Sequence, residues 1–93
     1  MLASITTSLN DGNDVVTVQL PDGRKIVGLV DSEDNIQILE NTTHLEGELA
    51  ECAAGIALVK AQDDGDEVMV WRRLVQAAEK CQKRIAVSKL KLN

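Results

Sequence analysis

The spacing of the apolar residues changes near residue 43, and no other feature of the sequence constrains the fold as strongly. Before that point, short β-branched segments alternate with turns, which predicts about four strands within residues 2–39. From residue 43 the apolar residues recur at helical spacing, which predicts helices over roughly 43–61 and 67–88. We therefore expect an α+β fold, in which an N-terminal antiparallel β-meander packs on a C-terminal antiparallel helical hairpin.

The clearest local prediction is a β-hairpin at Pro21-Asp22-Gly23. Pro presets the backbone φ and Gly takes the left-handed position, so this tripeptide suits a tight turn between strands 14–20 and 25–31. The turn places Val18 opposite Ile26. We expect the helices to cover the more apolar face of the hairpin, which carries Val16, Val18, Leu20, Ile26 and Val30. The opposite face keeps three exposed apolar candidates, Val15, Val27 and Leu29.

The two predicted helices also have a predicted register. Thr43-His44-Leu45-Glu46 has the capping-box pattern that opens a helix, and the short segment 62–66 makes the helices antiparallel neighbours. If the loop centres near Gly65, Ala57 faces Trp71 and Cys52 faces about residue 76. Cys81 is then five residues away, roughly 7.5 Å along a helix axis. We therefore expect two buried free thiols rather than a disulfide.

Composition limits the classes of protein to which the chain can belong. Its 93 residues allow one domain, and a hydrophobic fraction of 44% is enough for one core. No apolar run approaches the length of a membrane span, and the start lacks the pattern of a signal peptide, so we expect a cytoplasmic protein. Trp71 is the single aromatic residue, and one ring cannot build a stacking platform for single-stranded nucleic acid.

Charge is distributed unevenly along the chain. Residues 1–71 carry 14 acidic and 3 basic side chains, a balance of −11, whereas residues 72–93 carry 7 basic and one acidic, a balance of +6. Seven acidic residues concentrate around the predicted sheet turns and form a candidate partner-binding side: Asp11, Asp14, Asp22, Asp31, Glu33, Asp34 and Glu40. Five basic residues share one face of the second helix and form a possible contact face: Arg72, Arg73, Lys80, Lys83 and Arg84.

The motifs of catalysis and metal binding are weak. His44 is the only histidine, and its charged neighbours Glu46 and Glu48 are ordinary helix-surface residues. Two cysteines and one histidine lack zinc-ligand spacing, the acidic segment 63–67 lacks the spacing of a calcium loop, and the glycines form no phosphate loop. We expect no enzyme, no cofactor and no metal.

These patterns favour a non-enzymatic protein-binding module that engages a basic partner with its acidic side. In its sharpest form this is an inhibitor that mimics nucleic-acid charge, of the anti-defence type. The alternative is a homodimeric structural or assembly subunit that buries Val15, Val27 and Leu29 or the exposed flank of the helical pair. Nucleic-acid binding by the second helix is disfavoured, because the whole chain has a net charge of −5.

Overall fold

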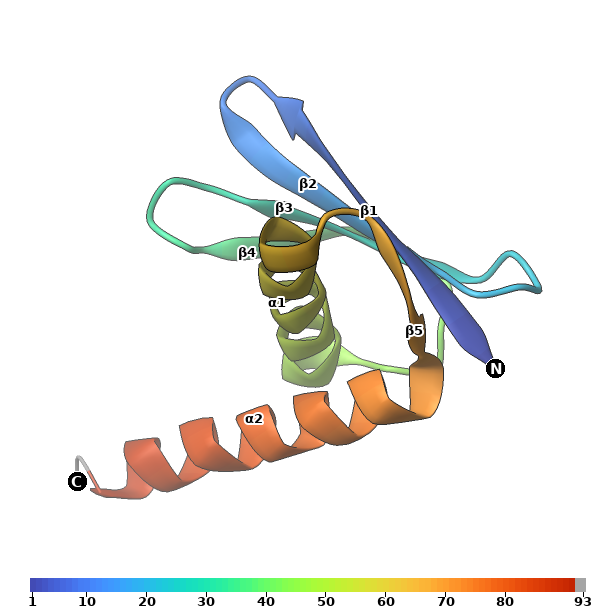
Figure 1. The fold of residues 1–93 in the computed structure, drawn as a ribbon. Helices are drawn as coiled ribbons and strands as arrows, with labels where there is room; N and C mark the ends of the chain where they lie inside the picture. The colour runs from blue at the N-terminus through green and yellow to red at the C-terminus, as the bar shows by residue number, and fades with distance from the viewer. Residues whose placement is uncertain (92–93) are drawn as a thin grey trace.

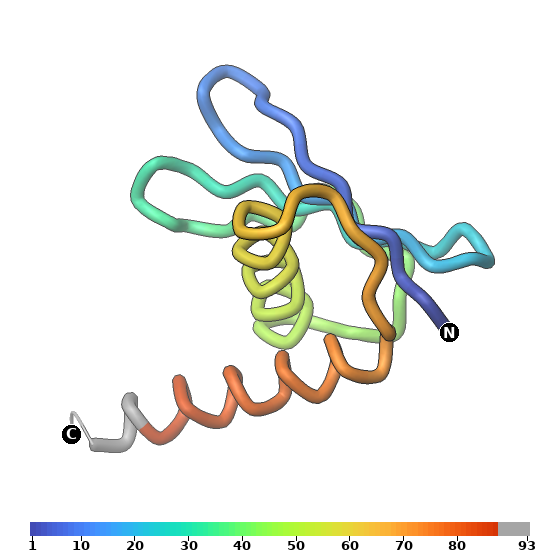
Figure 2. The backbone as a smooth tube through the Cα atoms, viewed as in Figure 1, coloured from blue at the N-terminus to red at the C-terminus, as the bar shows by residue number. Residues whose placement is uncertain are grey.

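The computed structural model describes the backbone of residues 1–91 and the side chains of residues 1–87. It is an α+β domain in which an antiparallel meander is followed by two helices (Figures 1 and 2). The elements, in chain order, are β1 (Leu2–Asn10), β2 (Asn13–Gln19), β3 (Lys25–Val30), β4 (Ile36–Asn41), α1 (Gly47–Asp64), β5 (Glu67–Val70) and α2 (Trp71–Lys91). The predicted fold class is confirmed.

The strands form one antiparallel sheet in the order β4-β3-β2-β1-β5. The hairpin between β2 and β3 has the predicted register, with Val18 opposite Ile26 and Val16 opposite Gly28. Both helices lie on the same side of the sheet (Figure 1). Val15, Val27 and Leu29 point away from the helices and are half-buried, since neighbouring side chains on the open face shield them.

β5 occupies residues that the helical spacing assigned to the start of the second helix. Glu67–Val70 instead alternates half-buried and exposed positions and pairs antiparallel with β1, with Met69 opposite Ala3. The strand forms because the free edge of β1 offers backbone hydrogen bonds that a first helical turn would not satisfy. The Trp71 N–H then donates to the Met1 carbonyl at 3.0 Å, where α2 begins.

α1 begins at Gly47, four residues later than predicted, and the capping-box prediction is wrong. Its N-cap is Glu46, in an extended conformation and without a side-chain capping bond. The Thr43 hydroxyl instead donates to Asn41 Oδ1 at 2.7 Å, within a turn that Asn41 also ties to the Leu45 carbonyl. The side chain that was expected to cap the helix is therefore used to shape the loop before it.

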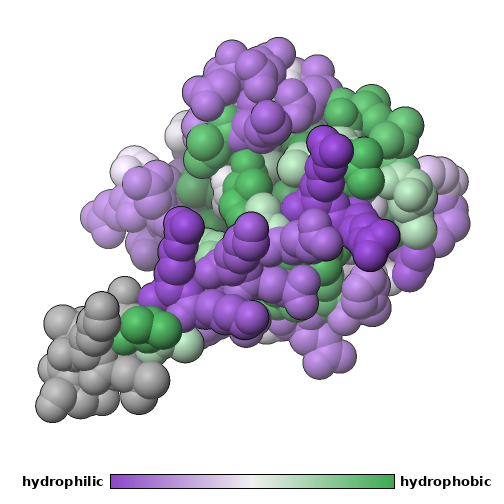
Figure 3. All heavy atoms as spheres, turned by 60° about the horizontal axis from the view of Figure 1, so that its bottom comes forward, coloured by the Kyte–Doolittle hydropathy of each residue, from purple (hydrophilic) through white to green (hydrophobic). Residues whose placement is uncertain are grey.

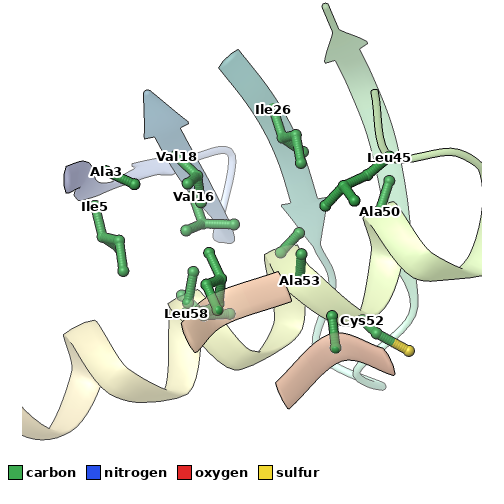
Figure 4. Packing of buried hydrophobic residues seen from close by; sticks show 14 of the residues in the cluster. Ala3, Ile5, Val16, Val18, Ile26, Leu45, Ala50, Cys52, Ala53 and Leu58 are labelled. Carbon is green, nitrogen blue, oxygen red and sulfur yellow. The ribbon is translucent and has the colours of Figure 1, made fainter. Parts of the chain in front are cut away.

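The core lies between α1 and the sheet and consists almost entirely of aliphatic side chains (Figure 4). α1 contributes a row of buried alanines to this core: Ala50, Ala53, Ala54, Ala57 and Ala61. Small side chains let the helix axis approach the sheet closely. The approach is tightest at Gly28 of β3, where an added Cβ would lie 3.1 Å from the Ala54 Cβ.

α2 crosses α1 and then extends beyond the rest of the molecule (Figure 1). Trp71, Leu74 and Ala78 are buried near its beginning, whereas every residue from 83 to 87 is exposed. Among the described residues, no helix is both long and apolar enough to cross a membrane.

Candidate functional site

Carboxylates from three separate segments meet at one end of the molecule. The β1–β2 and β3–β4 turns lie at the same end of the sheet, and the end of α1 lies against them (Figure 1). Gln62 of α1 donates to Asp14 Oδ2 at 3.4 Å, and the Thr7 N–H of β1 donates to Asp66 Oδ1 at 3.1 Å. We call this region the acidic end; its members are Asp11, Asp14, Asp31, Glu33, Asp34, Asp63, Asp64 and Asp66.

Five of the seven acidic residues singled out from the sequence therefore lie together, and two do not. Asp22 and Glu40 lie at the opposite end of the sheet, where each has a basic partner. Asp22 pairs with Arg24 at 2.7 Å, and Glu40 pairs with Lys25 at 3.2 Å. The meander explains the separation, because successive turns alternate between the two ends of the sheet.

Asp31 differs from its acidic neighbours because its carboxylate builds the β3–β4 turn. It accepts hydrogen bonds from the backbone N–H groups of Asn35 at 3.0 Å and Glu33 at 2.9 Å, and from Asn35 Nδ2 at 3.2 Å. These donors, the Asn35 backbone N–H first, hold the pKa of Asp31 below its ordinary value. Asp34 follows in the same turn with a positive φ of 63°.

An apolar groove of 790 Å³ adjoins the acidic end, between the β3–β4 turn, α1 and α2. Its floor consists of Ile36, Cys52, Gly55, Ile56, Val59 and Ile85. Its rim carries the acidic residues Asp34, Glu48, Glu51 and Asp63, with Lys60 as the one basic residue. Figure 3 shows hydrophobic surface beside the hydrophilic side chains that project from the molecule. The groove thus combines an apolar floor with a negative rim.

The sequence did not reveal this groove, because it depends on where α2 crosses α1. Gly55 is one local contribution: an added Cβ there would lie 3.0 Å from Ile36 Cδ1, so the missing side chain lets β4 and α1 approach each other. Ile56 and Val59 lie on the side of α1 that α2 leaves uncovered, and Val59 is 58% exposed. The signal in the sequence was a pair of apolar residues three positions apart in α1, the half-buried Ile56 and the exposed Val59.

Cys52 and Cys81 lie beside each other at the base of the groove, although the predicted register separated them. Both are free thiols, as expected, but only Cys52 is buried, at 7% exposed, whereas Cys81 is half-buried. Burial, followed by the neighbouring Cys81 thiol, raises the pKa of Cys52 to about 11. A thiol with so high a pKa is protonated at neutral pH and is a poor nucleophile.

His44 is exposed and stands edge-on to Trp71, with 6.1 Å between the ring centroids. The contact gives this histidine a packing role beside the start of α2. No group of three or more His, Cys, Asp or Glu side chains within the described residues could hold a metal ion.

The basic residues that were predicted to share one face lie on α2. These five residues, Arg72, Arg73, Lys80, Lys83 and Arg84, are all exposed. None of them forms an ion pair within the part of the chain that the structure describes. The acidic end and the basic face of α2 are thus two separate charged surfaces on one small domain.

The chain was compared with models of protein families, with curated proteins and with solved structures, and none of these comparisons gave a match. The acidic end, the groove and the basic face are the features of the molecule that bear on its function.

Proposed function

We propose that this chain is a non-enzymatic protein-binding module whose acidic end engages a basic surface of a partner protein. The gathering of carboxylates from two turns and the end of α1 carries the proposal. Across the described residues, the only ion pair at this end joins Lys60 and Asp64, at 3.8 Å. Like charges held close together repel one another and oppose folding. A positively charged partner would relieve this repulsion, so the unneutralised carboxylates favour binding to a basic surface.

The sharper form of the proposal is mimicry of nucleic-acid charge. Carboxylates displayed from turns can take the positions of phosphates on a basic surface, and the protein then competes with nucleic acid for that surface. An inhibitor of a nucleic-acid-binding defence protein would act in this way. Its association rate would depend steeply on salt, because steering between exposed charges is screened within about 10 Å at 0.1 M ionic strength.

Binding is favoured over catalysis by the chemistry of the two reactive side chains. His44 packs against Trp71, and the Cys52 thiol is protonated at neutral pH. Neither residue has the arrangement of a nucleophile or a general base.

The test removes three charges at one end of the sheet and compares the result with three removed at the other. Asp11→Asn/Glu33→Gln/Asp34→Asn removes three negative charges from the acidic end and keeps the hydrogen bonds that the Asp31 carboxylate accepts. Asn tolerates the positive φ that Asp11 and Asp34 adopt. The matched control is Asp22→Asn/Glu40→Gln/Glu46→Gln.

A partner is captured from cell lysate at low salt, identified by mass spectrometry, and tested for binding by surface plasmon resonance. We expect the first variant to associate at least about tenfold more slowly than the parent, and the control to stay within about twofold, because charges near a contact steer the encounter. Nucleic acid should displace the parent from the partner. Equal association rates for the two variants would refute the proposal, and failure of nucleic acid to compete would refute the mimicry.

A further inference from the structure

The side chains of α2 from residue 83 to residue 87 pack against little of the described chain. Every residue from 83 to 87 is exposed, and this part of α2 extends beyond the rest of the molecule (Figure 2). A short helical segment gains little stability in water unless its side chains pack against another element. The exposed side of α2 over residues 83–87 therefore lacks a packing partner within the described part of the chain.

The exposed side of this segment combines an apolar residue with three cations. Val87 is 48% exposed and follows Arg84 by three residues, Lys83 by four and Lys80 by seven. At these spacings all four side chains share one face of the helix. The opposite face, through Cys81 and Ile85, already lines the chain's own groove.

The groove has the complementary chemistry. Ile56 and Val59 offer apolar surface for Val87, while Asp34, Glu51 and Asp63 on the rim offer carboxylates for the cations. Within the described chain, the cations of α2 form no ion pair with these carboxylates. Since the basic side of α2 faces away from its own groove, a second α2 is needed to bring the two surfaces together.

We propose that two copies of this chain form a two-fold dimer in which the exposed side of each α2, at Lys80, Lys83, Arg84 and Val87, docks into the groove of the other copy. The contact is made twice under two-fold symmetry, which doubles the area that one short helix buries. This inference goes beyond the proposed function and does not rest on it, because the purified chain alone suffices for its test.

The test reverses the charges on the two sides of the contact separately. Lys83→Glu/Arg84→Glu changes the helix, and Glu51→Lys/Asp63→Lys changes the rim; Asp34 is left intact because its positive φ disfavours lysine. The matched control, Arg72→Glu/Arg73→Glu, makes the same charge change in the first turn of α2. Acidic side chains there interact favourably with the helix dipole, so the control should not destabilise the helix. Circular dichroism and thermal melts establish that each variant is folded.

Sedimentation equilibrium at about 10–200 µM gives the oligomeric state. We expect the parent and the control to be dimers. The dimer dissociation constant of each reversed variant should be at least about tenfold higher than that of the parent, because like charges then face each other. An equimolar mixture of the two reversed variants should form a heterodimer, since both of its contacts again join opposite charges.

A parent that is monomeric throughout this range would overturn the proposal. So would reversed variants that dimerise as well as the parent, or a mixture that stays monomeric. If the monomeric parent binds an apolar fluorescent probe, and Val59→Glu abolishes this binding, the groove is a site for a small apolar ligand instead. None of these outcomes bears on the capture of a basic partner by the acidic end.

Discussion

The close approach of α1 to the sheet predicts that one substitution, glycine to alanine, has different effects at two neighbouring sites. At Gly28 of β3, an added Cβ would lie 3.1 Å from the Ala54 Cβ and 3.5 Å from Val16 Cγ1. At Gly55 of α1, it would lie 3.0 Å from Ile36 Cδ1. The second distance is the shorter one, yet we expect the first substitution to be the more harmful.

The reason is the freedom of the atom that must move. The Ala54 Cβ is fixed to the helix backbone, so relieving the contact at Gly28 requires α1 to shift away from the sheet. Overpacking of this kind costs about 1–3 kcal/mol, and the lower chain entropy of unfolded alanine offsets about 0.4–1 kcal/mol of it. We expect Gly28→Ala to lower the free energy of unfolding by about 1–2 kcal/mol.

At Gly55 the neighbouring atom is the end of a rotatable side chain. Moving Ile36 Cδ1 out of its preferred rotamer costs about 0.5–1.5 kcal/mol. Replacing glycine with alanine inside a helix contributes about 0.8–1.0 kcal/mol in the opposite direction. The two effects nearly cancel, so Gly55→Ala should leave the free energy of unfolding within about 0.5 kcal/mol of the parent.

Urea titration and thermal melts at one fixed protein concentration measure both effects. For a domain of this size, 1 kcal/mol corresponds to roughly 4–8 °C in Tm, so Gly28→Ala should melt at least about 4 °C below the parent. Adding Ala54→Gly should restore part of the loss, with a coupling of at least about 0.5 kcal/mol in a double-mutant cycle. A parental Tm for Gly28→Ala, or strictly additive changes in the cycle, would show that α1 does not lie against β3 at this point.

Three further predictions concern buried or hydrogen-bonded side chains. Ala57 is fully buried, so Ala57→Leu should overpack α1 and lower the free energy of unfolding by about 1–3 kcal/mol in urea titration; an unchanged value would mean free space beside the helix. The raised pKa of Cys52, about 11, means that folding keeps this thiol protonated, so stability should fall as pH rises from about 9 toward 11. Cys52→Ala should show a shallower fall in melts over that range, and a parallel curve would count against the burial argument. The pKa of Asp31 lies below its ordinary value, so its contribution to the turn should be lost only as pH falls through that lowered value. Carboxyl titration followed by NMR should give Asp31 a midpoint below the ordinary value of an aspartate, and Asp31→Ala should speed hydrogen exchange at the Asn35 amide.

Local parts of the fold could be predicted because neighbouring residues determine them. Pro21 and Gly23 specify the hairpin turn, and Gly23 has the positive φ, 93°, that the turn requires. β-branched residues on both sides then fix the register of Val18 and Ile26. Each of these choices depends on residues that lie within about ten positions of one another.

Features that depend on distant residues could not be predicted in the same way. Glu67–Val70 alternates as a strand does, but four residues beside a long helical pattern do not outweigh that pattern, and only the free edge of β1 decides between them. Inserting β5 also shifts the crossing of α2 over α1, which brings Cys81 beside Cys52. The groove follows from that crossing and could not be predicted. The acidic end follows from the alternation of turns in a meander, so most of its residues could be predicted from the sequence.

The pairing of β5 with β1 has a consequence for the order in which the chain can fold as it is synthesised. β1 is made first, but the residues opposite Leu2 and Ile5, Val70 and Glu67, are more than 60 positions away. At about 5–20 residues per second, several seconds pass before the ribosome has made both partners. During this interval the outer edge of β1 remains unpaired even if the hairpin of β1 and β2 has already formed. The last strand to be synthesised therefore completes the hydrogen bonding of the first.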